Sequence, residues 1–160
     1  MKFYFKKKAF SLDNNTLCIA DEAGNKKYDL KTSIMITKTI RILDEDKQEV
    51  AVIKQELKSL MPKYSVYVHD EKIMEVKKVF PPLIPKYEIT GLGWQMNSRL
   101  MRHDYDILKD GNPVLTVSNH MLGSFHTCQI EIFNPRDELN ALAVATAIDL
   151  GIEGESLTKE

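Results

Sequence analysis

Cysteine is scarce in this sequence: Cys18 and Cys128 are the only two among 160 residues. Two cysteines are too few for a scaffold held by disulfides, and they fit a protein of the reducing cytosol. Catalytic signatures are missing as well. No serine lies in a G-x-S-x-G elbow, and Gly91-Leu92-Gly93 precedes no predicted helix, so it is no dinucleotide fingerprint. We therefore predict no cofactor and no catalytic residue.

A long apolar run and a large excess of one charge are also absent. The first ten residues, MKFYFKKKAF, contain no apolar core of a signal peptide. The uncharged stretch 139–148 is about half as long as the roughly 20 residues of a membrane-spanning helix. With a formal net charge of −1 and no arginine–aromatic cluster, nucleic acid is not a predicted partner. We expect a cytoplasmic protein without a transmembrane segment, with one domain over residues 1–152 and a polar tail over 153–160.

Short stretches with alternating polarity fill most of the chain. In residues 3–10, for example, Phe3 and Phe5 share one face of a strand, while Tyr4, Lys6 and Lys8 share the other. Alternation and β-branched content predict a mainly β protein of about twelve strands. They cover residues 3–10, 16–20, 26–30, 34–43, 50–55, 64–69, 73–79, 87–90, 94–96, 105–108, 114–118 and 127–133.

An acidic turn recurs between these strands. It begins at Asp21, Asp44, Asp70 and Asp110, with spacings of 23, 26 and 40 residues. Hairpins repeated at such spacing favour a closed or nearly closed antiparallel barrel, which removes exposed strand edges. A barrel of about 12 strands is too wide to be filled by its own side chains, which fill about eight. Another element must therefore occupy the lumen.

The stretch RDELNALAVATAIDL, residues 136–150, is the candidate for that element. Bulky side chains form two stripes separated by alanines, which indicates a helix contacted from several directions rather than a surface helix. Asn134 is a suitable N-cap and Pro135 a suitable first helical residue. Gly151 is expected at the position after the helix, where a left-handed conformation is common. The sequence predicts a barrel threaded by this C-terminal apolar helix.

The order of these features resembles the tubby C-terminal-domain-like architecture, and within it the LURP-one-related family. The resemblance covers nearly the whole chain. It is carried by KKKAFSL at 6–12, DEDKQEVAVIKQELKSL at 44–60, Pro62-Lys63-Tyr64, Pro85-Lys86-Tyr87 and NPRDELNALAVATAID at 134–149. The unit at 79–83, VFPPL, departs from the pattern. Relatives on this fold include the phosphoinositide-binding tubby domain and phospholipid scramblases, so the resemblance implies a membrane-lipid role by analogy of fold alone.

The lysines offer a candidate anion-binding site. Residues 1–100 hold 18 basic against 13 acidic side chains, whereas residues 101–160 hold 4 against 10. If Phe3 and Phe5 face inward, Lys6 and Lys8 face outward about 7 Å apart, and they can bind a phosphate or an anionic lipid. The alternative is a solubilising strand face that prevents edge pairing.

Histidine provides the other candidates. His126 and Cys128 share a strand face and His120 lies one loop earlier, which is half of a metal site, although no second pair completes zinc spacing. His103, Asp104 and Asp106 are close in sequence and could exchange protons, or form an ordinary solvated turn.

Two functions remain open. The first, which we favour, is a non-enzymatic module that binds anionic phospholipid, phosphate groups or a protein, and acts peripherally at the membrane. The alternative is a lipid-handling, scramblase-like protein or an enzyme that uses His103, Asp104, His120 and His126 at the barrel rim. Convergence of these four side chains in one cavity would favour the alternative.

Overall fold

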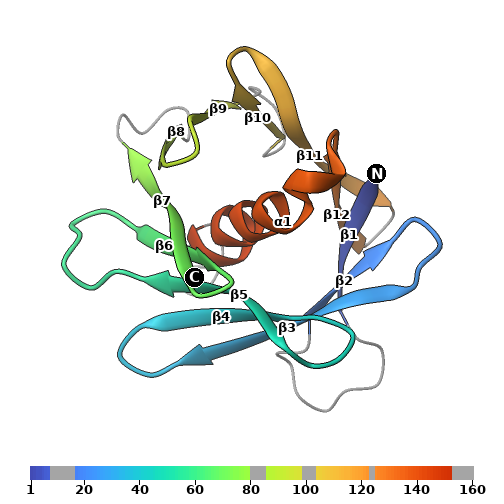
Figure 1. Cartoon of the computed structure of the whole chain (residues 1–160), viewed down its shortest axis with the longest axis horizontal. Helices are drawn as coiled ribbons and strands as arrows, with labels where there is room; N and C mark the ends of the chain where they lie inside the picture. Colours follow the sequence, from blue (N-terminus) through green and yellow to red (C-terminus); the bar gives the residue numbers. More distant parts are fainter. Residues whose placement is uncertain (8–16, 80–85, 99–103, 123–124, 153–160) are drawn as a thin grey trace.

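Twelve antiparallel strands form one sheet that curls into a nearly closed barrel around a helix (Figure 1). The computed structural model describes residues 1–7, 17–79, 86–98, 104–122 and 125–152. The strands are β1 (Lys2–Lys7), β2 (Leu17–Asp21), β3 (Lys26–Ile34), β4 (Lys38–Leu43), β5 (Glu49–Gln55), β6 (Lys63–Val68), β7 (Glu71–Val79), β8 (Lys86–Thr90), β9 (Trp94–Ser98), β10 (Tyr105–Lys109), β11 (Asn112–Leu122) and β12 (Phe125–Ile132). The predicted mainly β barrel is confirmed.

The ring closes where the beginning of the chain meets its last strand. β1 pairs with β2 on one side and with β12 on the other, with Phe3 opposite Ile130. The Met1 ammonium also donates to the Ile132 carbonyl at 3.0 Å. The barrel is nearly closed because, among the described residues, β8 and β9 are joined by a turn but share no ladder. These two strands are therefore the free edges of the sheet.

The lumen is filled by the C-terminal helix, as the sequence predicts (Figure 1). A 3₁₀ turn (Pro135–Asp137) leads into α1 (Glu138–Thr146), which continues as a π-helical turn, η2 (Ala147–Ile152). The Asn134 side chain caps the start by accepting from the Arg136 N–H at 3.1 Å. Every side chain from 141 to 148 is buried, so strands surround the helix on all sides. The alanines keep it thin enough for this position.

Gly151 does not have the predicted role. It lies inside η2 rather than after the helix, and its backbone is not left-handed. A Cβ at this position would lie 3.2 Å from two ring carbons of the fully buried Tyr64. Glycine suits this position because an aromatic ring packs directly against the backbone.

One hairpin turn lies elsewhere than predicted. The sequence favours a strand over 34–43, but β3 continues to Ile34, and the chain reverses at residues 35–37 before β4 begins. The reason is the β3–β4 register, in which Lys31 pairs with Arg41 and Ser33 with Thr39, so residues 31–33, which lie between two predicted strands, extend the ladder. The Met35 N–H closes the true turn by donating to the Thr37 carbonyl at 3.3 Å.

Candidate functional site

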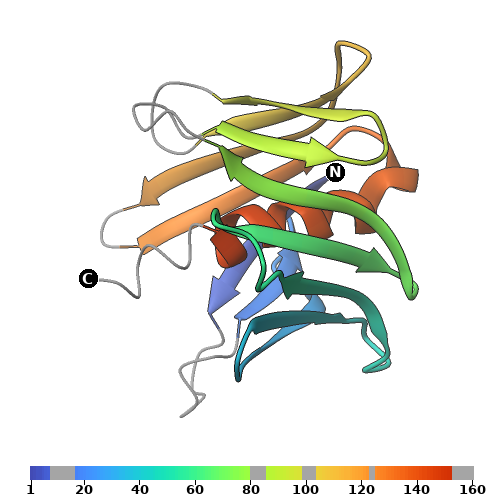
Figure 2. The same cartoon turned by 90° about the vertical axis from the view of Figure 1, so that its left-hand side faces the viewer.

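The two ends of the barrel differ in charge. Because consecutive strands are antiparallel neighbours, alternate turns lie at opposite ends, and the four acidic turns share the end at which α1 begins. We call turns 21–25, 44–48, 69–71 and 110–111 the acidic end; they contain eight carboxylates and one lysine. In Figure 2 the start of α1 lies toward the right and the C-terminal end of the helix toward the left. The positive N-terminal end of the helix dipole favours this arrangement.

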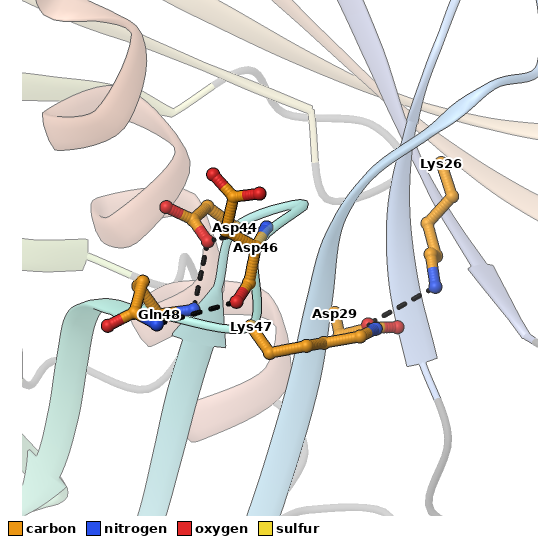
Figure 3. Close-up of polar contacts among 6 residues, drawn as sticks. All are labelled: Lys26, Asp29, Asp44, Asp46, Lys47 and Gln48. Atoms are coloured by element: carbon orange, nitrogen blue, oxygen red, sulfur yellow. Dashed lines mark hydrogen bonds and ion pairs between the residues drawn. The ribbon is translucent and has the colours of Figure 1, made fainter.

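Carboxylates at the acidic end and on the adjoining strand β3 are largely held within the fold (Figure 3). Asp44 accepts the backbone N–H of Asp46 at 3.0 Å. Lys47 has a left-handed backbone with φ of 63°, which directs its ammonium back to Asp29 on β3. Asp29 is only 4% exposed and also pairs with Lys26 at 3.2 Å. These contacts give the carboxylates a structural role in shaping the turns.

A cleft of about 670 Å³ opens at the acidic end. At its inner side, the Tyr28 hydroxyl donates to Glu138 of α1 at 2.7 Å, and burial together with this carboxylate raises the pKa of Tyr28. An ion pair of 3.3 Å joins Lys27 to Glu45 at the wall. The cleft is lined by Met1, Lys2, Phe3, Asp21, Glu22, Ala23, Lys27, Tyr28, Asp44, Glu45, Asp46 and Glu138. Among the predicted site residues whose side chains the structure describes, none lines this cleft.

The opposite end presents apolar side chains to solvent on two neighbouring hairpins. We call residues 31–38, around the β3–β4 turn, and residues 54–63, around the β5–β6 turn, the lysine–apolar rim. The first segment exposes three consecutive apolar side chains, and the second exposes two leucines. The exposed fractions are 69% for Ile34, 90% for Met35, 84% for Ile36, 66% for Leu57 and 104% for Leu60.

Hydrogen bonds hold the two segments of the rim together. The Lys38 N–H at the start of β4 donates to the Gln55 side chain at the end of β5, at 2.9 Å. The Glu56 N–H closes the second loop by donating to the Lys63 carbonyl at 2.9 Å. The Lys38 ammonium reaches inward to the carbonyl of Leu150, in the last turn of the helix. The rim is thus one connected surface that touches the C-terminal end of the helix.

The rim is basic. Its two segments contain five lysines, at 31, 38, 54, 58 and 63, and a single acidic residue, Glu56. Lys31 and Lys58 are exposed. The Lys54 ammonium lies 5.2 Å from the centre of the Tyr67 ring, whereas Lys63 is paired with Glu75 at 3.0 Å. Cations and exposed apolar side chains therefore occur together at this end.

A carboxyl group lies inside the barrel close to the rim. Asp149, in η2, accepts a hydrogen bond of 2.8 Å from the Tyr105 hydroxyl of β10 and lies 3.9 Å from the Cys128 sulfur of β12. Burial raises the pKa of Asp149 to about 7, although the hydrogen bond from Tyr105 acts in the opposite direction. Burial and the nearby carboxylates also raise the pKa of Cys128, so its thiol stays protonated. A protonated thiol is a poor nucleophile.

Comparison with known proteins places the chain in a family. A family model for LURP-one-related proteins matches residues 1–149. The chain belongs to the LURP-one-related family. This LURP-one-related protein is also similar to the uncharacterized protein YxjI of Bacillus subtilis (strain 168), with 26% identity over 112 residues, or 70% of this chain and 69% of YxjI. No solved structure matches it significantly. The resemblance seen in the sequence is confirmed.

The predicted anion-binding lysines of this LURP-one-related chain lie on or after β1. Lys6 is exposed, and its ammonium lies 3.6 Å from where a Cβ at Gly24 would be, beside the turn between β2 and β3. Lys8 lies outside the described residues, so the pair stays a prediction. Neither residue belongs to the lysine–apolar rim, which the sequence did not reveal. An apolar triplet without glycine or proline predicts a strand, and only the register places it in a turn.

The histidine candidates are only partly visible in the structure. His103 lies outside the described residues. His120 and His126 lie on β11 and β12, opposite Thr127 and Met121, and their side chains are outside the description. Asp106 accepts from the Thr116 hydroxyl at 2.7 Å. Within the part of the chain that the structure describes, no three His, Cys, Asp or Glu side chains are grouped to hold a metal ion. The same part contains no helix long and apolar enough to cross a membrane.

Proposed function

We propose that this LURP-one-related protein is a non-enzymatic module that binds phosphate-bearing anionic surfaces reversibly through its lysine–apolar rim. The observation that supports this function is the separation of charge along the barrel axis. Five lysines and one carboxylate lie on the rim, while eight carboxylates and one lysine lie on the four turns of the acidic end. A protein with this polarity orients its basic end toward an anionic surface.

The charges are numerous enough for measurable binding. A lysine near an anionic membrane contributes about 1 kcal/mol, so the exposed Lys31, Lys54 and Lys58 together contribute roughly 3 kcal/mol before the entropy lost on binding is subtracted. The helical segment from Pro135 to Ile152 separates the rim from the acidic end by roughly 25 Å, at about 1.5 Å per residue. That separation is about three Debye lengths at physiological salt, so repulsion from the acidic end is screened.

Binding fits the described side chains better than catalysis does. The Cys128 thiol is held protonated, and Asp106 is engaged by Thr116. The rim, by contrast, presents exposed cations. The protein in this proposal is cytoplasmic and binds at the membrane face peripherally.

Co-sedimentation with phosphatidylcholine vesicles, with and without phosphatidylserine, tests the proposal. We expect binding only when phosphatidylserine is present, and weaker binding as salt shortens the Debye length from about 10 Å at 0.1 M to about 3 Å at 1 M. Inorganic phosphate added as a competitor separates recognition of a single phosphate group from recognition of a charged surface.

Charge-reversal variants identify the surface. Lys31→Glu with Lys58→Glu should lower vesicle binding at least about ten-fold, because two favourable contacts become two unfavourable ones. The matched control is Lys109→Glu with Arg136→Glu, which changes the net charge equally but at exposed positions near the acidic end. Lys6→Glu, measured separately, tests whether the lysine on β1 contributes to binding. Equal loss in both double variants, or no binding by the wild type, would contradict the proposal.

A further inference from the structure

The apolar side chains of the rim have no role in the fold. Ile34 is the last residue of β3, whereas residues 35–36, Leu57 and Leu60 lie beyond the strand ends, and none of the five belongs to the buried core. Single exposed apolar side chains are common on soluble proteins and need no explanation. Here, three exposed apolar side chains follow one another at one hairpin tip and two more lie on the neighbouring hairpin, so the five form a cluster rather than isolated positions. Turns normally contain glycine, asparagine, aspartate or proline, so this composition departs from local preference.

We infer that residues 34–36, Leu57 and Leu60 insert between the headgroups of an anionic lipid bilayer and anchor the protein there. This inference rests on the proposed function and narrows its partner to the bilayer itself, as opposed to a soluble phosphate compound. Apolar side chains with a surrounding ring of lysines are typical of segments that enter the membrane interface. The apolar groups reach the acyl boundary, while lysine stems let the ammonium groups stay at the level of the phosphates.

The placement of the lysines suits insertion. The exposed Lys31 flanks the first apolar tip, and the exposed Lys54 and Lys58 flank or lie within the second loop. The ammonium groups of Lys38 and Lys63 are held instead by the Leu150 carbonyl and by Glu75. The Lys38–Gln55 hydrogen bond keeps the two tips side by side, so both can enter the same surface. The rim segments contain five lysines, and lysine is depleted in protein–protein interfaces. A bilayer is therefore favoured over a protein partner.

Insertion and charge attraction have different signatures. Attraction alone is lost at high salt, whereas buried apolar area keeps part of the binding under the same conditions. Ile34→Ser, Met35→Ser and Ile36→Ser combined should weaken binding to phosphatidylserine-containing vesicles at least about ten-fold and remove the salt-resistant part. Lys31→Glu with Lys58→Glu should instead remove mainly the salt-sensitive part. Because all substituted side chains are exposed, far-UV circular dichroism melts should match the wild type.

A tryptophan placed in the tip of the β3–β4 hairpin directly reports how deeply that tip enters the bilayer. In a Trp94→Phe background, which removes the single native tryptophan, Met35→Trp should shift its emission to the blue with vesicles and be quenched by brominated phosphatidylcholine. Lys109→Trp, near the acidic end, is the control and should be affected by neither. Two results would contradict insertion but leave the proposed function standing. The first is a tryptophan at position 35 that is not quenched in vesicle-bound protein, and the second is full salt-resistant binding by the triple serine variant. Failure of the wild type to bind anionic vesicles would overturn the proposed function and the insertion together.

Discussion

Replacing Asp149 by asparagine should change how stability depends on pH. The carboxyl lies inside the barrel between Tyr105 and Cys128, and burial raises its pKa from an ordinary 3.8 to about 7. Between these two values the folded protein holds a proton that the unfolded chain has lost, so the free energy of unfolding falls as pH rises. Below about pH 4 both states are protonated, and the contribution no longer changes.

The size of the effect follows from the shift. About three pKa units at 1.36 kcal/mol each correspond to about 4 kcal/mol lost above pH 7, and discounting for the water that still reaches Asp149 leaves roughly 2–4 kcal/mol. Asparagine has nearly the same shape and keeps an oxygen to accept from Tyr105. Asp149→Asn should therefore be more stable than the wild type near pH 8 by this amount and nearly equal to it near pH 4.

Urea denaturation at a series of pH values measures the difference. Trp94, the single tryptophan and only 3% exposed, gives a fluorescence signal from the core. Asp110→Asn is the control, because Asp110 lies in an exposed turn with φ of 50°, a conformation that asparagine tolerates. Its curve should run parallel to the wild type. If the Asp149→Asn and wild-type curves are also parallel from about pH 4 to 8, the carboxyl is not desolvated and the reasoning fails.

Three further predictions test the fold. Ala143→Leu should cost on the order of 1–3 kcal/mol in urea denaturation, because Ala143 is fully enclosed by strands, and an unchanged midpoint would mean the helix is not enclosed. Asn134→Ala should cost about 1 kcal/mol by removing the helix cap, and Asn134→Ser should recover most of it. Gly91→Ala should destabilise far more than Gly93→Ala: a Cβ at 91 would lie 2.3 Å from the Ile73 carbonyl oxygen, whereas one at 93 has no neighbour within 4 Å. Equal thermal melts for these two would refute the close approach.

The strands and the helix could be predicted because their signals are local. Alternation with a period of two marks which side chains face the lumen, and Asn134-Pro135 marks where the helix begins. The filled lumen could also be predicted, since a ring of about twelve strands leaves space that its own side chains cannot fill. All of these features follow from chain geometry and need no knowledge of distant contacts.

The site depends on contacts that the sequence does not display. In the sequence, Asp149 is a charge at the end of an apolar helix. Its raised pKa is caused by burial inside the barrel, where it contacts Tyr105, 44 residues away. The sequence is basic over residues 1–100 and acidic over residues 101–160, but this division does not correspond to the two ends of the barrel. In an antiparallel sheet, consecutive turns lie at alternate ends, so the charge at each end comes from every second turn. The triplet at 34–36 has strand-like composition, and only the pairing of β3 with β4 makes it a turn.

The helix that fills the lumen follows all twelve strands in the chain, so the strands of the barrel are synthesised before the helix that they enclose. A ring that closed first would have to open again to admit the helix. The last pairing, between β1 and β12, joins residues more than 120 positions apart and carries a large entropy of closure, which makes it slow. We therefore expect folding in which the strands collapse onto the helix and the ring closes last. Until then the inner faces and edges of the unfinished sheet stay exposed, and this is the stage at which the protein is most prone to aggregate.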